Sequence, residues 1–408
     1  MLNSPLRRPS GIAAFVVVGI TAAALTGCSS STESSSSTST TMARPTTTET
    51  VPANEVRIGL EGPLSGEQKS VGIGMLDAAK LAAAELNAHG GILGKNVTIV
   101  PIDDKADPEA GVKAVKAAIA AGLSGVVGPY NSGVGVKTLP LYLKAGLVPI
   151  RLTSANSTEG LGVTLQPMTS QIAPVATTAI TEWQKAKSVG IIYDKTQTYT
   201  ADANTAMKST LAKAGVRVTT DTAITPGKTS YASTVKAVEA THPDLIYIVT
   251  YYPEAGRIAK AMHASGSSTK CLADFGAYDN GFIPAAGIPA AEACPVVGVP
   301  DPADFPGSAP LIASYVAAYG TPPGTWSPYA YDSVTILANA ATSAGGFESS
   351  KILASLNAES LWHGWTGRVN FQAKTGDRIP PSVAVVRSDA KGAFHIDTAW
   401  EAATGYAF

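Results

Sequence analysis

The chain has 408 residues, and its formal net charge at pH 7 is −1. Because only 15% of the residues are charged, no basic face is expected, and nucleic acid is excluded as a partner. About 350 residues follow the N-terminal leader and tether described next. That is more than one hydrophobic core usually serves, so two lobes are expected.

The first 28 residues have the pattern of an export signal. Arg7 and Arg8 precede an apolar run, Gly11–Leu25, which is shorter than the roughly 20 residues of a membrane span. Small residues lead directly into Cys28, and this segment resembles a bacterial lipobox. The resemblance implies a lipid anchor on Cys28 and export to the extracytoplasmic face of the cell membrane. An ordinary signal peptide with a chance cysteine is the alternative.

Residues 29–54 are almost entirely Ser, Thr, Pro and Glu. Such a segment cannot bury enough apolar surface to fold, so it is expected to be a disordered tether. Its reach is about 25–30 Å if it behaves as a flexible coil.

From Glu55 onward, apolar runs of strand length alternate with segments of helical periodicity. Repeated strand–helix units predict parallel sheets with helices on both faces, and two successive blocks predict two Rossmann-like lobes of an α/β fold. The predicted strands are 56–60, 97–102, 125–128, 148–152, 189–193, 216–224, 245–249, a short strand near 272, 296–299, 369–371, 383–386 and 394–396. Helices are predicted around 76–86, 108–119, 203–214, 231–240, 253–264, 311–319 and 329–343, and Pro140 should kink or shorten another helix.

Two polar corners stand out within Gly125–Glu159. Asn131 and Ser132 follow the first buried strand of this stretch, and a run of hydroxyl and amide residues from Thr153 to Thr158 follows the second. Strands that end in hydroxyls and open helices present free N–H groups at the positive end of a helix dipole. The pattern predicts a small anionic group, such as a carboxylate, held between the corners. Simple helix capping is the alternative.

Cys271 and Cys294 are the two cysteines that remain after Cys28. In an exported protein a disulfide between them is expected, and two unpaired buried thiols are the alternative. The disulfide would close a loop of about 24 residues.

Six segments in a fixed order stand out as motifs. They are 62–66 (Gly-Pro-Leu-Ser-Gly), 85–94 (Glu-Leu-Asn-Ala-His-Gly-Gly-Ile-Leu-Gly), 103–104, 194–197, 251–256 and 367–377. By these segments the chain, from about Val56 to the C-terminus, resembles the type I periplasmic binding proteins, specifically the branched-chain amino-acid (Leu/Ile/Val) receptors of ABC importers. The resemblance implies two lobes joined by three crossovers, near residues 173, 300 and 377, which close on the ligand by a hinge motion. Lobe one would hold 55–173 and 300–377, and lobe two would hold 174–299 and 378–408.

The same resemblance implies a set of ligand contacts. The α-carboxylate would be held in the first lobe, and aromatic side chains would come from the second. The implied contacts are Tyr130, Asn131, Ser132, Ser154, Ala155 and Asn156 in the first lobe and Tyr199, Tyr251 and Tyr252 in the second.

The partner of an amino acid's ammonium group stays open. The family places an acidic residue where a direct alignment puts Phe275, and Asp274 stands one residue earlier. A one-residue shift in a strand turns a side chain to the other face. Either Asp274 faces the ligand and pairs with an ammonium, or the solute is not an amino acid.

Catalysis is not expected. The five histidines are scattered without metal-ligand spacing, and the glycine-rich segment 128–133 lacks the lysine of a phosphate loop. No cofactor or metal is expected. The predicted function is that of a monomeric solute-binding lipoprotein which delivers a branched-chain or related amino acid to an ABC permease. The alternatives are a ligand-sensing lipoprotein, or transport of an amide, urea or an aromatic acid.

Overall fold

The computed structural model describes residues 54–358 and 362–406. These residues all belong to one compact unit. The predicted signal peptide, Cys28 and nearly all of the predicted tether lie outside the described residues. Within the described part, no helix is both long enough and apolar enough to cross a membrane.

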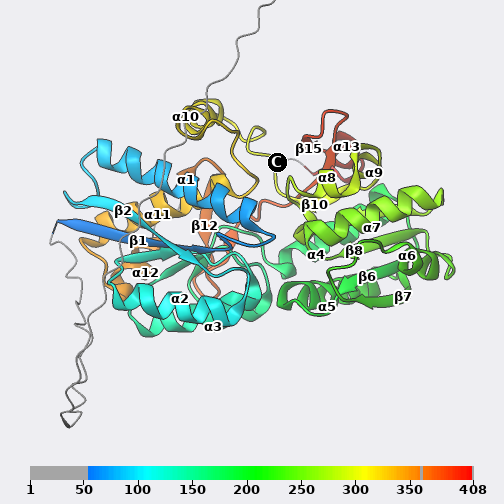
Figure 1. Ribbon diagram of the computed structural model, residues 1–408, viewed down its shortest axis with the longest axis horizontal. Coiled ribbons are helices and arrows are strands. Elements are labelled where there is room, and N and C mark those ends of the chain that lie inside the picture. Colours follow the sequence, from blue (N-terminus) through cyan, green and yellow to red (C-terminus); the bar gives the residue numbers. More distant parts are fainter. Residues whose placement is uncertain (1–53, 359–361, 407–408) are drawn as a thin grey trace, which may run out of the picture. The chain divides into compact units, whose positions relative to one another are not determined.

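The first sheet consists of five parallel strands. Its crossover helices cover both faces, with α1 and α11 on one side and α2 and α3 on the other (Figure 1). In spatial order the strands are β2 (Asn96–Asp103), β1 (Glu55–Gly62), β3 (Gly125–Val127), β4 (Pro149–Arg151) and β5 (Val163–Thr164). The helices of this half are α1 (Lys69–Ala88), α2 (Pro108–Ala120), α3 (Ser132–Lys144), the 3₁₀ turn η1 (Asn156–Thr158) and α11 (Ser327–Ala344).

The second sheet has seven strands and is mixed rather than wholly parallel. In spatial order they are β15 (Phe394–Ile396), β14 (Ala384–Ser388), β10 (Val296–Gly298), β9 (Lys270–Ala273), β8 (Leu245–Val249), β6 (Ser188–Asp194) and β7 (Arg217–Ile224). The strands β6 to β10 pair in parallel, whereas β14 runs antiparallel to both β10 and β15. The prediction of parallel sheets therefore fails at this edge, because the few residues joining β14 to β15 allow only an antiparallel hairpin.

Helices cover both faces of the second sheet as well, and Figure 1 shows α7 on one side and α5 on the other. These helices are α5 (Thr198–Lys213), α6 (Ala232–Glu239), α7 (Tyr252–Ser265), the 3₁₀ turn η3 (Phe275–Ala277), α8 (Phe282–Ala286), α9 (Ile288–Ala293) and α13 (Thr398–Thr404). Cys271, in β9, and Cys294, just before β10, form a disulfide bond.

The chain passes between the two sheets three times: after β5, after β10, and before β14. The first passage contains α4 (Thr169–Thr178) and the π-helical turn η2 (Ala179–Trp183), and the second leads to α10 (Ala309–Tyr319). After α11 come α12 (Ser349–Ala358) and a small antiparallel sheet of β11 (Trp362–Gly364), β12 (Gly367–Phe371) and β13 (Arg378–Ile379). The fold class predicted from the sequence is confirmed.

A buried ion pair ties the third passage to the first sheet. The guanidinium of Arg151, at the end of β4, lies 2.9 Å from the carboxylate of Asp377. Thr164 in β5 also forms an isolated parallel bridge with Asp377. Arg151 donates further hydrogen bonds to the carbonyls of Thr153 and Thr375. This ion pair therefore joins the end of β4 to a segment more than 200 residues away in the sequence.

The helix α3 tests the prediction made for Pro140. It continues past this proline for four residues, to Lys144, so the helix is not shortened. Leu139 and Tyr142 on either side of the proline are fully buried. Their burial offsets the lost backbone hydrogen bond, and tertiary contacts thus decide the length of this helix.

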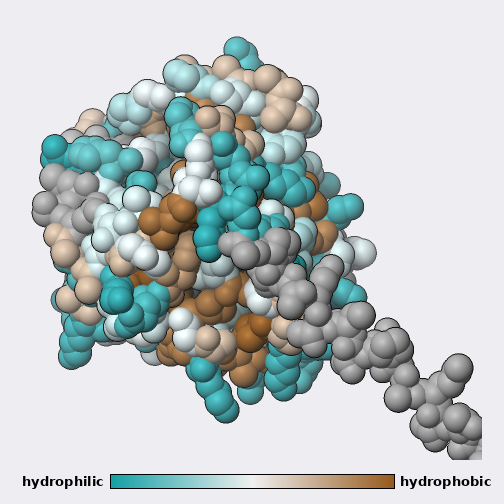
Figure 2. All heavy atoms as spheres, turned by 90° about the vertical axis from the view of Figure 1, so that its left-hand side faces the viewer, coloured by the Kyte–Doolittle hydropathy of each residue, from teal (hydrophilic) through white to brown (hydrophobic). Residues whose placement is uncertain are grey.

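Apolar side chains are directed mainly inward. On the face shown in Figure 2, hydrophilic residues surround smaller hydrophobic patches. The large apolar side chains exposed in the described part are Leu93, Ile288, Val316 and Ile379, which are 39–44% exposed.

Candidate functional site

The candidate site lies where strands of both sheets end. Tyr130 and Ser132 follow β3, and Ser154 follows β4. In the second sheet, Tyr251 follows β8 and Phe275 follows β9. Because ligands in open α/β folds bind at the carboxyl ends of parallel strands, both sheets direct their binding ends to this place.

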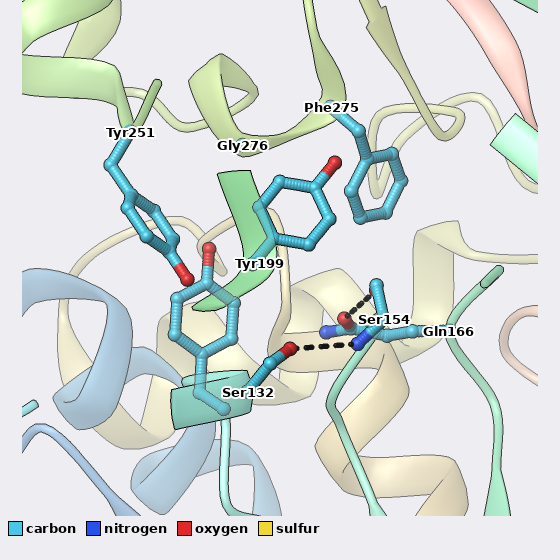
Figure 3. Close-up of a pocket in the computed structure, with 8 residues that line it drawn as sticks. Ser132, Ser154, Gln166, Tyr199, Tyr251, Phe275 and Gly276 are labelled. Carbon is cyan, nitrogen blue, oxygen red and sulfur yellow. Dashed lines mark hydrogen bonds between the residues drawn. The ribbon is translucent and has the colours of Figure 1, made fainter. Parts of the chain in front are cut away.

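A small cavity of about 10 Å³, with room for about one water molecule, lies between these strand ends. Four lining residues come from the half that holds the first sheet and four from the half that holds the second (Figure 3). They are Tyr130, Ser132, Ser154 and Gln166 from the first, and Tyr199, Tyr251, Phe275 and Gly276 from the second.

The first half contributes a corner of hydrogen-bonding groups. The Ser132 hydroxyl oxygen accepts hydrogen bonds from the backbone N–H groups of Ser154 at 3.3 Å and of Ala155 at 3.2 Å. The Ser154 hydroxyl donates to Oε1 of Gln166 at 3.1 Å. Ser132 is also the first residue of α3, whose preceding residue, Asn131, makes no capping bond with its side chain. The corner therefore combines hydroxyl groups with the positive end of a helix dipole.

The second half contributes aromatic rings. The ring centroid of Tyr199 lies 6.0 Å from that of Tyr251 and 6.5 Å from that of Phe275. Tyr130 approaches Tyr251 from the other half at 6.4 Å. Behind this group, the Trp326 ring lies 5.2 Å from Phe275. The rings form a wall that can cover an apolar or aromatic part of a solute.

The tyrosines of this wall are neutral phenols at physiological pH. Burial is the largest cause that raises the pKa of Tyr130, Tyr199 and Tyr251 above the ordinary value of 10. No side chain with a formal charge is among the eight that line the cavity. A charged solute would therefore be held by neutral donors, ring faces and backbone groups.

The structure bears directly on the choice between Asp274 and Phe275. Phe275 lines the cavity, and Asp274 does not. Asp274 is 2% exposed, and its carboxylate accepts hydrogen bonds from the hydroxyls of Tyr199 and Tyr247, both at 2.5 Å. Burial raises the pKa of Asp274, and these two hydroxyls act in the opposite direction. The 3₁₀ turn η3 begins at Phe275, so the chain turns at this point and directs Phe275 rather than Asp274 into the cavity.

Four other predicted contacts lie beside the cavity rather than in its lining. The side-chain amide of Asn131 donates to Gln68. Ala155 contributes its backbone N–H to Ser132, as described above. The remaining two, Asn156 and Tyr252, join the two halves.

Asn156 and Tyr252 form hydrogen bonds from one half to the other. The backbone N–H of Asn156 donates to the carboxylate of Asp202 in α5 at 2.8 Å. The hydroxyl of Tyr252, at the start of α7, donates to the carbonyl of Glu67 at 2.9 Å. These residues therefore contact the opposite half in this structure, and the N–H of Asn156 is already engaged.

Gln166 and Gly276 are lining residues that the sequence analysis missed. Gln166 follows the two-residue strand β5, and Gly276 lies inside the single turn η3. Neither segment has a hydrophobic period or a motif, so the sequence carries no signal that would have singled them out.

Comparisons with known proteins cover nearly all of the described chain. A family described as "Periplasmic binding protein" matches residues 55–393. The chain is 27% identical over 334 residues to "Leu/Ile/Val-binding protein homolog 2" of Brucella abortus, and this alignment covers 81% of this chain and 89% of that protein. It is 28% identical over 342 residues to "Leu/Ile/Val-binding protein BraC3" of Rhizobium johnstonii, and that alignment covers 82% of this chain and 92% of the relative.

Solved structures share the fold. A leucine-binding protein, LivK, of Thermotoga maritima superposes with a TM-score of 0.77 at 21% identity and covers 84% of this chain and 97% of its own. A solute-binding protein of an ABC transporter from Rhodopseudomonas palustris BisB5, in complex with 3,4-dihydroxybenzoic acid, superposes with a TM-score of 0.73 at 17% identity. It covers 84% of this chain and 96% of its own. The same fold thus occurs with solutes of different chemistry.

Proposed function

Since the chain belongs to the periplasmic binding protein family, we propose that it is an extracytoplasmic solute-binding protein of an ABC importer. It captures one small solute between its two halves and delivers it to a permease in the membrane. The observation that carries this proposal is the cavity at the facing strand ends, to which each half contributes four lining residues. The family's relatives are solute-binding proteins rather than enzymes.

The polar corner is the proposed site for the carboxylate of the solute. Ser132 and Ser154 stand at the N-terminus of α3 and in the loop after β4. Hydroxyl donors and a helix N-terminus together stabilise an anion without a formal positive charge. The remaining predicted contacts, Asn131, Ala155 and Asn156, would position this corner.

The aromatic wall is the proposed site for the side chain of the solute. Tyr199, Tyr251 and Phe275 present ring faces and edges to the cavity. Burial of a branched aliphatic side chain against them gains about 1.5–3 kcal/mol from apolar surface removed from water. A branched-chain or related amino acid, as the names of the curated relatives suggest, is the first candidate.

An acid without an ammonium group is the second candidate, and the position of Phe275 favours it. A buried ammonium needs a carboxylate or several carbonyls, because an unpaired charge in a protein interior is very costly. Asp274, the residue before Phe275, does not line the cavity, and its buried carboxylate accepts hydrogen bonds from Tyr199 and Tyr247. In an amino-acid complex, the ammonium would therefore rely on ring faces and on the oxygen of Tyr199.

Closure of the two halves is the proposed capture step. The bonds from Asn156 to Asp202 and from Tyr252 to Glu67 bridge the halves. Opening would break both and expose the cavity, which is a hinge motion of the kind known for two-lobed binding proteins. The division into lobes at 55–173 with 300–377, and 174–299 with 378–408, belongs to this proposal.

The membrane anchor is a further part of the proposal. A lipid on Cys28 would keep the binding unit close to its permease, and the segment 29–54 would act as the tether. Presentation of the solute to a separate sensor is the alternative use of the same protein. Deletion of the gene separates the two: loss of solute uptake supports transport, and normal uptake with altered gene expression supports sensing.

A thermal-shift panel tests the proposed solute class. The protein is unfolded and refolded first, so that carried-over ligand is removed. The panel contains leucine, isoleucine, valine, alanine, glutamate, benzoate, 4-hydroxybenzoate, urea and acetamide. A ligand at 100 times its dissociation constant stabilises the fold by about 2.7 kcal/mol, which raises the melting temperature by several degrees. A response to leucine, isoleucine or valine supports the first candidate, and a response to the aromatic acids alone supports the second. A response to urea or acetamide and to none of the acids would refute a carboxylate solute.

A further inference from the structure

Gln166 is held rigidly at the edge of the cavity. It follows β5, and it is 2% exposed. Its backbone N–H donates to the hydroxyl of Thr164 at 3.1 Å, and its carbonyl accepts from the same hydroxyl at 3.3 Å. The backbone of Gln166 is therefore held by Thr164 and its side chain by Ser154, and the side chain lines the cavity.

One end of the Gln166 amide has no partner. Oε1 accepts the hydrogen bond from the Ser154 hydroxyl at 3.1 Å. Nε2 is buried, and within the described residues it has no hydrogen-bond partner. Figure 3 shows this nitrogen end of Gln166 directed toward the space between Ser132 and Tyr199. An unsatisfied buried donor is unfavourable by itself, so a buried donor aimed into a binding cavity indicates an acceptor on the ligand.

The hydroxyl of Ser132 is a second hydrogen-bond donor at the cavity, as a count of its hydrogen bonds indicates. A serine hydroxyl has two acceptor lone pairs and one O–H donor. The N–H groups of Ser154 and Ala155 occupy both lone pairs. The remaining function of the Ser132 hydroxyl is donation, and Ser132 lines the same cavity as Gln166.

We propose that Gln166 is a solute-binding residue, which donates from Nε2 to one oxygen of the solute's carboxylate while Ser132 donates to the other. This assignment rests on the proposed function and narrows it. Two donors match the two oxygens of a carboxylate. A carboxamide would present its own NH₂ group to one of the donors, and that donor would stay unsatisfied. The corner therefore selects acids over the corresponding amides, and urea and short amides are disfavoured as solutes.

The substitution Gln166→Glu tests the assignment with almost no change in shape. The new side chain keeps an oxygen to accept from Ser154, but it replaces the donor at Nε2 with a carboxylate oxygen. It should therefore repel a solute carboxylate. Gln166→Met removes the donor without adding charge. Gln372→Glu adds the same charge at an exposed position and serves as the control.

The measurement is isothermal titration of the full-length protein and its variants with leucine, valine, leucinamide and benzoate. For each acid that binds the wild type, we expect Gln166→Met to weaken binding by roughly 10- to 100-fold, since a hydrogen bond to a charged group is lost. Gln166→Glu should weaken it more than 100-fold, and Gln372→Glu should leave it unchanged. Leucinamide should bind the wild type at least roughly 10-fold more weakly than leucine. Melting curves without ligand verify that each variant is folded.

Several outcomes would overturn the assignment. Unchanged affinity in Gln166→Met would remove Gln166 from the binding residues while leaving the proposed function intact. Tighter binding in Gln166→Glu would mean that an acceptor is wanted at this position, as for a solute ammonium. A wild-type protein that binds leucinamide but none of the acids would refute the carboxylate corner itself, and the proposed solute class would fall with it.

Discussion

Asp104 should make this protein more stable in mild acid than in mild base. It follows β2 directly and is fully buried. One carboxylate oxygen accepts from the N–H of Ala106 at 2.8 Å, and the other has no partner within the described residues. Burial is the main cause that raises the pKa of Asp104 from its ordinary value of 3.8 to about 7, with smaller contributions from Asp103 and Asp107. The Asp104 charge in turn raises the pKa of buried Glu61, after the larger effect of burial.

The sign of the effect follows from the raised pKa. The folded state binds the proton more tightly than the unfolded state, so stability is greatest below about pH 4 and is lost as the pH rises through about 7. A difference of about 3 pKa units corresponds to about 4 kcal/mol in total. Integration between pH 5 and pH 8 assigns about 2–3 kcal/mol of the lost stability to Asp104.

The substitution Asp104→Asn removes this titrating group, together with the charge that raises the pKa of Glu61. The side-chain oxygen can still accept from Ala106, and the titrating group is gone. The quantity of interest is the free energy of unfolding of the variant minus that of the wild type. We expect this difference to be about 2–3 kcal/mol larger at pH 8 than at pH 5. Asp279 and Asp301, whose pKa values burial raises to about 6, act in the same direction, but they are present in both proteins and cancel.

Urea unfolding at pH 5 and pH 8 measures the free energy of unfolding for both proteins, with equal m-values as the condition for comparison. Glu109→Gln, at an exposed position of α2, is the control for removal of one carboxylate. If wild type and Asp104→Asn lose stability equally between the two pH values, the reasoning about this buried carboxyl is wrong.

Three further predictions concern the halves and their connection. Tyr252→Phe removes the hydroxyl that donates to the Glu67 carbonyl, so affinity for a bound acid should fall roughly 2- to 10-fold in titration calorimetry. An unchanged dissociation constant would mean that this bond does not stabilise the closed state. Arg151→Met leaves the Asp377 carboxylate buried without its partner and should cost about 3–5 kcal/mol in urea unfolding. A cost under about 1 kcal/mol would contradict that estimate. Reduction of the disulfide, whose cysteines are 23 positions apart, should lower stability by about 3 kcal/mol, and identical urea midpoints with and without reductant would count against it.

The alternation of strands and helices could be predicted because it depends on local periodicity. The predicted strand at 245–249 coincides with β8, and the strand predicted at 56–60 lies within β1. Strands buried on both faces read as continuous apolar runs, and amphipathic helices repeat every three to four residues. The short, irregular elements such as β5, η2 and β11 have no such period, and the sequence analysis did not anticipate them.

The meeting of the two polar corners could also be anticipated. Ser132 and Ser154 follow neighbouring parallel strands, whose carboxyl ends lie at one edge of the sheet. The hydroxyl of Ser132 does accept from the backbone N–H of Ser154. Here topology alone places the residues, since parallel strands β3 and β4 share their direction and register.

The longer strands and helices, the two α/β blocks and the polar residues at the strand ends could be predicted, because those features are encoded in short stretches. Which side chains face the cavity depends instead on how distant segments pack. Phe275 rather than Asp274 lines it because the chain enters the turn η3 there, and Gln166 lines it because β5 ends beside β4. The Arg151–Asp377 pair joins residues 226 positions apart. Such contacts depend on how distant segments pack in three dimensions, and no local pattern records them.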